Sequence, residues 1–432
     1  MLQWQWLIFA MLFSSTLLAE EDFFIEEDSE FDATEVITTT SDEKLIDLDR
    51  SHRFSIAYQL GTDISQGPDI RAHQLDFRYR WDKLLNDAWY AKLDAKLIAI
   101  GPKDIRLSDN ENIEPDWLIN ALNIQWSHQQ TATTFGFQSI MLGELDTLPV
   151  NDVLSPWDYS QQAFTNPEDS RIGQVAIDHQ WFIKANHSIR FVFVPIPDVN
   201  RYPAQGLTEL FSLAPTVSID KTLPYEDVAW EAILISKLSF SAVDTHILLG
   251  RLHSNDPVLE FVDNDKIKAK YPSFEIVGFS VNYNWGNFLW KIEGNFQNDV
   301  PLSGTKRQYS DSYSLGAGFD YDANGRYQLS FETRFSELLD PPTTPLGQVS
   351  STKQSALRFS KDLLNELVNL IYFVSYDWTH KDQIHSAYAS YKITDHWLLS
   401  AGFSLFHIPD KESPMEIADK WDQFTVTVTH DL

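Results

Sequence analysis

Asp422-Gln-Phe-Thr-Val-Thr-Val-Thr-His-Asp-Leu432 is the stretch that decides the fold of this chain. Its threonines occupy one parity, and its apolar residues occupy the other, namely Phe424, Val426, Val428 and Leu432. Because alternate residues of a strand point to opposite faces, the segment predicts a strand with one apolar and one polar face. The edge strand of a soluble sandwich would read the same way, so repetition along the chain has to separate the two alternatives.

The same two-residue alternation runs through the chain from His52 onward. In residues 287–297 and 309–321, aromatic residues such as Trp290 and Phe319 hold one parity, and polar residues such as Glu293 and Asp320 hold the other. Eighteen such segments lie near residues 52–61, 72–81, 89–99, 116–126, 132–141, 172–181, 187–195, 228–237, 241–251, 273–285, 287–297, 309–321, 325–336, 352–360, 367–378, 383–391, 396–406 and 422–432. Sixteen strands is the alternative count, because segments 352–360 and 383–391 are weak.

The connectors between these segments are broadly long and short in turn, as in 142–171 followed by 182–186. Thr379–Asp382 breaks the alternation, because it should be long. Brief turns at one end and extended loops at the other are typical of an up-and-down barrel in a membrane, and Tyr and Trp gather near segment ends, as at lipid headgroups. We therefore predict an all-β, transmembrane, antiparallel β-barrel over residues 51–432, with both termini on the periplasmic side.

Composition agrees with a barrel and argues against helical spans. Aromatic residues make up 13% of the chain, with 14 Trp, and charged residues make up 22%, a mixture that suits a lipid-facing exterior and a wet interior. No apolar run after the N-terminus approaches the 18 or so residues that a helical span needs. The net charge of −29 argues against a nucleic-acid partner, since phosphates need Lys and Arg to neutralise them.

Residues 1–19 have the form of a secretory signal peptide, although no Lys or Arg precedes the apolar run. That run, Leu7–Phe13, is too short for a membrane anchor, and Ala19 is followed at once by acidic residues. We expect cleavage after Ala19. The chain contains no Cys, so disulfide and thiolate chemistry are excluded.

Residues 20–50 form an acidic segment with thirteen Asp and Glu against one Lys and one Arg, a net charge of −11. Such a segment is too repulsive to fold alone, so we predict a disordered periplasmic tail. Phe23, Phe24 and Phe31 could dock it onto a periplasmic partner. The alternative is a solvated tail that keeps the exported chain soluble.

The third long connector, residues 142–171, combines acidic and apolar residues. Its apolar residues predict that it packs into the barrel mouth or lumen, where its acids would form a pore constriction: Glu144, Asp146, Asp152, Asp158 and Asp169. Strand parity places a basic wall opposite: Arg78, Arg80, Lys92, Lys96, Arg190, Arg334 and Arg358. Acids facing bases would screen solutes with a transverse field. Alternatively, these residues pair with one another and fill the interior.

Catalytic, metal and cofactor sites are not expected. His253-Ser254-Asn255-Asp256 has the residue types of a hydrolase, but neighbours in one loop seldom face one another as a triad must. The histidines are scattered without metal-ligand spacing, and the acidic connector lacks the glycine punctuation of a calcium loop.

Taken whole, residues 52–432 resemble a Gram-negative outer-membrane β-barrel of the porin or export-channel type. The connector 142–171 resembles the inward-folded third loop of general porins in position and length. The runs Leu142-Gly-Glu-Leu-Asp, Asn151-Asp-Val-Leu-Ser-Pro and Asn200-Arg-Tyr-Pro are similar to a region of uncharacterised proteobacterial barrels, some related to alginate-export channels or associated with RND-type exporters. The resemblance implies outer-membrane lipid and the barrel-assembly machinery as partners.

Two functional hypotheses follow. The first is an outer-membrane channel, not an enzyme, that passes a small or linear solute through a lumen narrowed by residues 142–171. The second is a plugged structural barrel that recruits a periplasmic or envelope transport complex through its acidic tail. A TonB-dependent receptor is disfavoured, because a 31-residue tail is too short for an inner plug.

Overall fold

The computed structural model describes residues 52–64, 70–102, 104, 113–159, 171–202, 218–222, 229–263, 266–302, 308–339, 350–410, 413, 418–419 and 421–432. The predicted signal peptide, the acidic tail with Phe23, Phe24 and Phe31, and Asp169 lie outside the described residues. The predictions for these segments therefore remain predictions.

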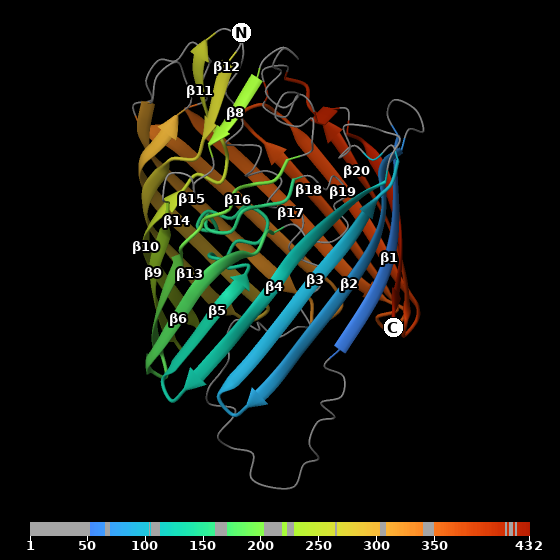
Figure 1. The fold of residues 1–432 in the computed structure, drawn as a ribbon, viewed down its shortest axis with the longest axis horizontal. Helices are drawn as coiled ribbons and strands as arrows, with labels where there is room; N and C mark the ends of the chain where they lie inside the picture. The colour runs from blue at the N-terminus through green and yellow to red at the C-terminus, as the bar shows by residue number, and fades with distance from the viewer. Residues whose placement is uncertain are drawn as a thin grey trace.

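Eighteen of the strands in the described residues form one closed sheet. They are β1 (His52–Asp63), β2 (Ile70–Asn86), β3 (Trp89–Ile100), β4 (Glu114–His128), β5 (Thr131–Gln138), β6 (Gln174–Lys184), β7 (His187–Val194), β9 (Glu231–Phe240), β10 (Val243–His253), β13 (Ser273–Trp285), β14 (Phe288–Leu302), β15 (Gln308–Asp322), β16 (Gln328–Leu339), β17 (Ser351–Leu363), β18 (Val368–Asp377), β19 (Gln383–Thr394), β20 (Trp397–His407) and β21 (Gln423–Asp431). Each strand pairs antiparallel with its neighbours along the chain (Figure 1). The prediction of 18 strands is confirmed.

The last strand closes the barrel onto the first. β21 pairs antiparallel with β1 in a regular register that joins Gln59 to Thr427 and Tyr58 to Val428. The backbone N–H of Leu432 donates a hydrogen bond to the carbonyl oxygen of Phe54 at 2.8 Å, which extends this seam to the carboxyl terminus. Closure leaves the 18-stranded sheet without an unpaired edge, which is what a hydrocarbon environment requires.

The connections are short at one end of the barrel and long at the other, as predicted. The short turns include Asp87–Ala88, Gln129–Gln130 and Gly286–Asn287, and several use a backbone with positive φ, such as Gln129 and Gly286. Residues 378–382, which break the alternation, are indeed a short connection between β18 and β19.

Three short strands at the long-loop end were not expected from the sequence. They are β8 (Ser218–Thr222), β11 (Val258–Asp263) and β12 (Lys266–Lys270), and they form a separate small sheet above the barrel (Figure 1). β11 and β12 are an antiparallel hairpin, and β8 joins it in parallel. Part of the long connectors therefore has its own hydrogen-bonded structure.

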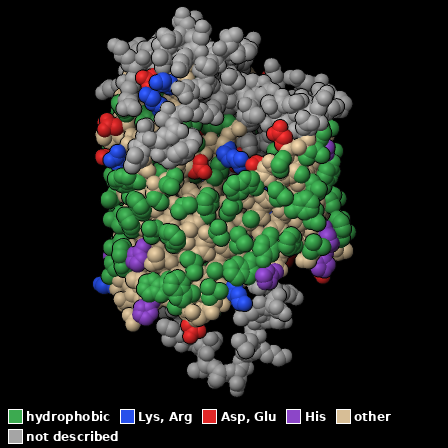
Figure 2. Space-filling view, in the orientation of Figure 1, with side chains coloured by type: hydrophobic (Ala, Val, Ile, Leu, Met, Phe, Trp, Pro, Cys, Tyr) green, Lys and Arg blue, Asp and Glu red, His purple; other side chains and the backbone are tan. Residues whose placement is uncertain are grey.

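The two faces of the barrel follow the predicted parity. Large apolar side chains such as Trp290, Ile292 and Phe331 are exposed on the outer face, whereas Glu293 and Glu332 of the opposite parity are completely buried. On the face seen in Figure 2, the hydrophobic side chains form a band across the barrel, and most charged side chains lie toward its two ends. A closed β-barrel with such a lipid-facing band is an outer-membrane protein. Separately, the described residues contain no helix that is long and apolar enough to span a membrane.

Candidate functional site

The connection between β5 and β6 enters the barrel. We call residues 139–173 the inner loop; its described residues are 139–159 and 171–173. Leu142 and Leu154 belong to a buried cluster with inward side chains of five barrel strands: Ala176, Val192, Val194, Ile233, Ile235, Leu248, Leu252, Phe274 and Ile276. Further along, Leu148 is fully buried against Ala356 and Phe373 of β17 and β18. The loop thus contacts the inner wall over a broad arc (Figure 1).

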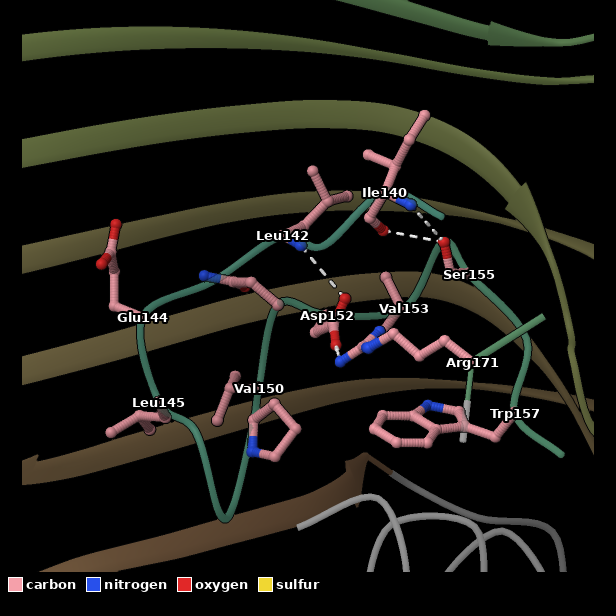
Figure 3. A network of polar contacts seen from close by, with 12 residues as sticks. Ile140, Leu142, Glu144, Leu145, Val150, Asp152, Val153, Ser155, Trp157 and Arg171 are labelled. Atoms are coloured by element: carbon pink, nitrogen blue, oxygen red, sulfur yellow. Dashed lines mark hydrogen bonds and ion pairs between the residues drawn. The ribbon is translucent and has the colours of Figure 1, made fainter. Parts of the chain in front are cut away.

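Hydrogen bonds join the two arms of the inner loop (Figure 3). Ser155 Oγ accepts a hydrogen bond from the N–H of Ile140 at 2.8 Å and donates one to the carbonyl oxygen of the same residue at 2.8 Å. Asp152 Oδ1 accepts from the N–H of Leu142 at 3.1 Å. These bonds satisfy backbone groups that no sheet pairs with, which is a condition for burying a loop.

Arg171 also joins the two arms of the inner loop at the point where the loop leaves the barrel wall. Its guanidinium forms an ion pair with Asp152, and both side chains are almost fully buried. The same guanidinium lies 4.1 Å from the centre of the Trp157 ring, at a distance suited to a cation–π contact (Figure 3). Asp152 was predicted to face the pore, but here its carboxylate is used within the loop.

Three neighbouring strands provide the surface on which the tip of the loop rests. Two rows cross them in register: Lys291, Gly318 and Glu332 form one row, and Glu293, Gly316 and Arg334 form the other. Each row has a base and an acid on either side of a glycine. We call these six residues the loop seat.

Glu293 accepts four backbone hydrogen bonds from the inner loop. Its Oε1 accepts from the N–H groups of Glu144 and, at 3.0 Å, Leu145. Its Oε2 accepts from the N–H groups of Val150 and Asn151 at 2.9 and 3.0 Å. One carboxylate therefore holds both sides of the loop tip.

Glu332 holds the residues between those two sides. Its Oε1 accepts from the N–H of Asp146 at 2.9 Å. Its Oε2 accepts from the N–H groups of Thr147 and Leu148 at 2.9 and 2.6 Å, and from Thr147 Oγ1 at 2.6 Å. Successive backbone N–H groups that converge on one anion form a nest, and such charge-assisted bonds are stronger than neutral ones.

Gly316 of the seat and Gly143 of the loop allow the two to approach closely. A Cβ added to Gly316 would lie 2.4 Å from Leu145 Cδ1 and 2.9 Å from Val150 Cγ2. In the loop, Gly143 has φ of +118°, and a Cβ there would lie 2.6 Å from Glu293 Oε1. Both positions require the absence of a side chain, Gly316 for space and Gly143 also for backbone conformation.

The bases of the seat and further wall residues complete the contact with the tip. Lys291 Nζ pairs with Asp146 and, at 2.7 Å, with Asp320. Arg334 donates to the carbonyl oxygen of Pro149 at 2.8 Å. Glu144 accepts from His246 and Asn282 on the adjoining wall. The Asp146 side chain remains half exposed, so this acid faces the interior space.

Several bases of the predicted basic wall form ion pairs with acids on the neighbouring strand. Arg78 pairs with Asp94 through two hydrogen bonds of 2.8 and 2.6 Å, and Lys96 pairs with Asp76 at 2.9 Å, all four side chains being buried. These pairs join β2 to β3 and do not involve the inner loop.

The other predicted bases are spread over the interior. Arg190 pairs with Asp178 on the neighbouring strand at 2.6 Å. Arg334 lies under the loop tip rather than opposite it. Arg358 is buried, and Arg80 and Lys92 share the inward parity of Arg78 and Asp94, with Lys92 exposed. Arg334 therefore contacts the inner loop through the carbonyl oxygen of Pro149 and not through one of the predicted acids. Arg78, Lys96 and Arg190 instead pair with acids of neighbouring strands.

Asp158 belongs to a joint between the inner loop and two outer connectors. Its carboxylate lies 3.7 Å from Arg201, whose backbone N–H donates to the carbonyl oxygen of Trp157 at 2.9 Å. In the same joint, Asp256 accepts from Tyr202 Oη and, at 2.6 Å, from Asn200 Nδ2. Burial raises the pKa of Asp256 to about 6, although both hydrogen bonds act in the opposite direction.

No hydrolase arrangement forms around His253. Ser254 Oγ donates to the carbonyl oxygen of Asp256 at 2.7 Å, while His253 Nδ1 lies 3.7 Å from Glu231. Among the described residues, no group of three or more His, Asp or Glu side chains is arranged to hold a metal ion.

Sequence reasoning missed the loop seat. Glu293 and Glu332 read as ordinary inward polar residues, and nothing local indicates a partner about 140 to 190 positions away. One signal could have pointed to them: Gly316 and Gly318 leave two adjacent inward positions of β15 without side chains. Such a gap beside two wall acids indicates that another segment approaches closely.

Comparison with known proteins identifies the fold. No protein-family model matches the chain, and no curated protein matches it in sequence. Solved structures do match. OccAB1 of Acinetobacter baumannii aligns with a TM-score of 0.54 and 10% identity, covering 89% of this chain and 97% of that one. A BenF-like porin from Pseudomonas fluorescens aligns with a TM-score of 0.54 and 7% identity, covering 88% and 97%. OpdK of Pseudomonas aeruginosa, solved with vanillate, aligns with a TM-score of 0.53 and 6% identity, covering 88% and 98%.

At these identities the likeness concerns the fold alone, which is that of outer-membrane porin barrels. The predicted relation to alginate-export or RND-associated barrels is not supported by these matches. The plugged barrel that recruits a partner is likewise not favoured by them.

Proposed function

We propose that this protein is a passive outer-membrane channel for small solutes, in which the inner loop sets the narrowest part of the path. The observation that carries the proposal is the anchoring of the loop inside the barrel. Buried apolar contacts and eight hydrogen bonds to Glu293 and Glu332 hold it against the wall. A wall-bound loop narrows the lumen without breaking the sheet around it.

The path would run between the loop tip and the wall of β1–β4 and β19–β21. The half-exposed Asp146 and the partly exposed Glu144 lie on the loop side. Across the lumen, Arg78 and Lys96 are neutralised by Asp94 and Asp76. Closely paired charges supply local dipoles rather than a net charge, so we expect the lumen to sort solutes by size and dipole.

The test is conductance of the purified full-length protein in planar bilayers, together with uptake of uncharged and charged small solutes into vesicles. Vanillate, which was solved with OpdK, is a reasonable member of the solute panel. We expect discrete conductance steps that grow when residues 145–150 are replaced by a short Gly-Ser link. No conductance by either form, over a range of voltages and in correctly folded protein, would refute the proposal.

A further inference from the structure

Glu293 and Glu332 bind the inner loop mainly through its backbone. The groups that they hold are the N–H groups of Glu144 and Leu145, of Asp146 to Leu148, and of Val150 and Asn151. The identity of the loop side chains matters little for these bonds, whereas the charge and shape of the two carboxylates matter throughout.

We propose that Glu293 and Glu332 are positioning residues that set the bore of the channel, meaning the width of its narrowest part. The loop tip presents two preformed binding sites for a carboxylate, and the side chains of these two wall residues occupy them. The inference rests on the proposed channel function, because a bore has meaning only if the barrel conducts. Neither residue need touch the solute, since each acts through the loop.

Glu293 and Glu332 bind different parts of the loop tip. Glu293 joins the start and the end of the tip, residues 144–145 and 150–151, and so closes it into a ring. Glu332 holds the middle of that ring, residues 146–148. Loss of Glu293 should open the ring, while loss of Glu332 should free its centre.

Further side chains hold the loop tip in the orientation that the two carboxylates require. Lys291 and Arg334 lie in the same two rows as the acids and also bond the loop, through Asp146 and the carbonyl oxygen of Pro149. Asn295 Nδ2 donates to the carbonyl oxygen of Val150 at 2.7 Å, and Asn151 Nδ2 donates to that of Phe279 at 2.8 Å. These contacts keep the N–H groups of the tip pointed at the wall.

The first test uses near-isosteric variants. Glu293→Gln and Glu332→Gln each keep the side-chain shape but set an amide NH2 group against N–H donors, which removes acceptors and adds repulsion. Glu275→Gln is the matched control, because Glu275 lies on the outer parity of β13 and is exposed. We expect single-channel conductance to rise about twofold or more in either test variant and to stay at the wild-type value in the control.

Hydrogen exchange supplies a readout that needs no conductance. In Glu293→Gln the amides of residues 144, 145, 150 and 151 should lose protection first, and in Glu332→Gln those of residues 146–148 should. The strand amides of β13–β17 should stay protected in both, which shows that the barrel is folded. Equal protection of the tip in wild type and variants would overturn the inference.

Chemical rescue tests the carboxylate sites themselves. Glu293→Ala should leave the N–H groups of the tip without their acceptor, and added acetate should return the conductance toward the wild-type value by occupying the site. Chloride at the same ionic strength should not. A wild-type protein that conducts while all variants match it would reject the positioning role and leave the channel intact, whereas absence of conductance in wild type and variants alike would reject the channel.

Discussion

Gly316 is the position where one added side chain should disturb the inner loop most directly. A Cβ there would lie within 3 Å of both Leu145 and Val150, so Gly316→Val should push the tip off the seat. Overpacking of this kind costs about 1–3 kcal/mol. We expect a lower unfolding midpoint on heating in detergent and a larger conductance. Ala317→Val, one residue away on the exposed outer parity, should change neither.

Asp256 predicts a pH dependence at the joint between the loops. Its pKa is raised to about 6 in the folded protein, above the usual value near 3.9, so folding favours its protonated form. The stabilisation from this group is complete below about pH 4 and is lost as the pH rises through about 6.

The amides of residues 198–202 should therefore exchange faster at pH 7.5 than at pH 5, after correction for intrinsic rates, by about tenfold or more. Asp256→Asn should remove most of that difference, because an amide does not titrate. The assignment would be wrong if the variant kept the full pH dependence.

At the scale of the element, the two-residue periodicity was enough to locate the strands. It did not show which loop segments pack against them. The alternation of Trp290 and Ile292 with Lys291 and Glu293 predicts β14 and its two faces, because sheet pleating enforces that period. The partners of Glu293 are backbone N–H groups of a remote loop, and backbone groups leave no trace in a sequence. The small sheet of β8, β11 and β12 was missed because it lies in connectors without a lipid-facing side.

The assignment of one strand face to lipid can be tested by placing an arginine at different depths in the bilayer. Leu315 is exposed near the middle of β15, whereas Leu339 is exposed at the end of β16. Arg on the lipid face costs about 2–4 kcal/mol at the bilayer midplane and about 0–1 kcal/mol near an interface. Urea unfolding in lipid vesicles should show Leu315→Arg as much less stable than Leu339→Arg. Equal costs would show that the lipid-facing band is misplaced.

For the whole molecule, the decisive feature is closure between β1 and β21. The chain has no Cys, so a pair introduced at Gln59 and Thr427, which face each other across the seam, can react only with each other within one barrel. We expect a disulfide to form on oxidation and to be visible as a shift on a denaturing gel.

The offset pair Gln59→Cys with Thr425→Cys is the control, because Thr425 pairs with Gly61 in the same register. Diagonal positions lie about 7–8 Å apart, beyond the reach of an unstrained disulfide. Efficient cross-linking of the offset pair, with none in the facing pair, would mean that the seam has a different register.

The loop seat also bears on the order in which the barrel is assembled. The inner loop follows β5, but the carboxylates that hold its tip are on β14 and β16, between 142 and 186 residues further along the chain. The tip cannot reach its hydrogen-bonding partners until β14 and β16 have joined the same sheet as β5 and β6. The pore should therefore stay wide in any insertion intermediate that lacks either the inner loop or the strands that hold it, and it should narrow only when both are part of one closed sheet.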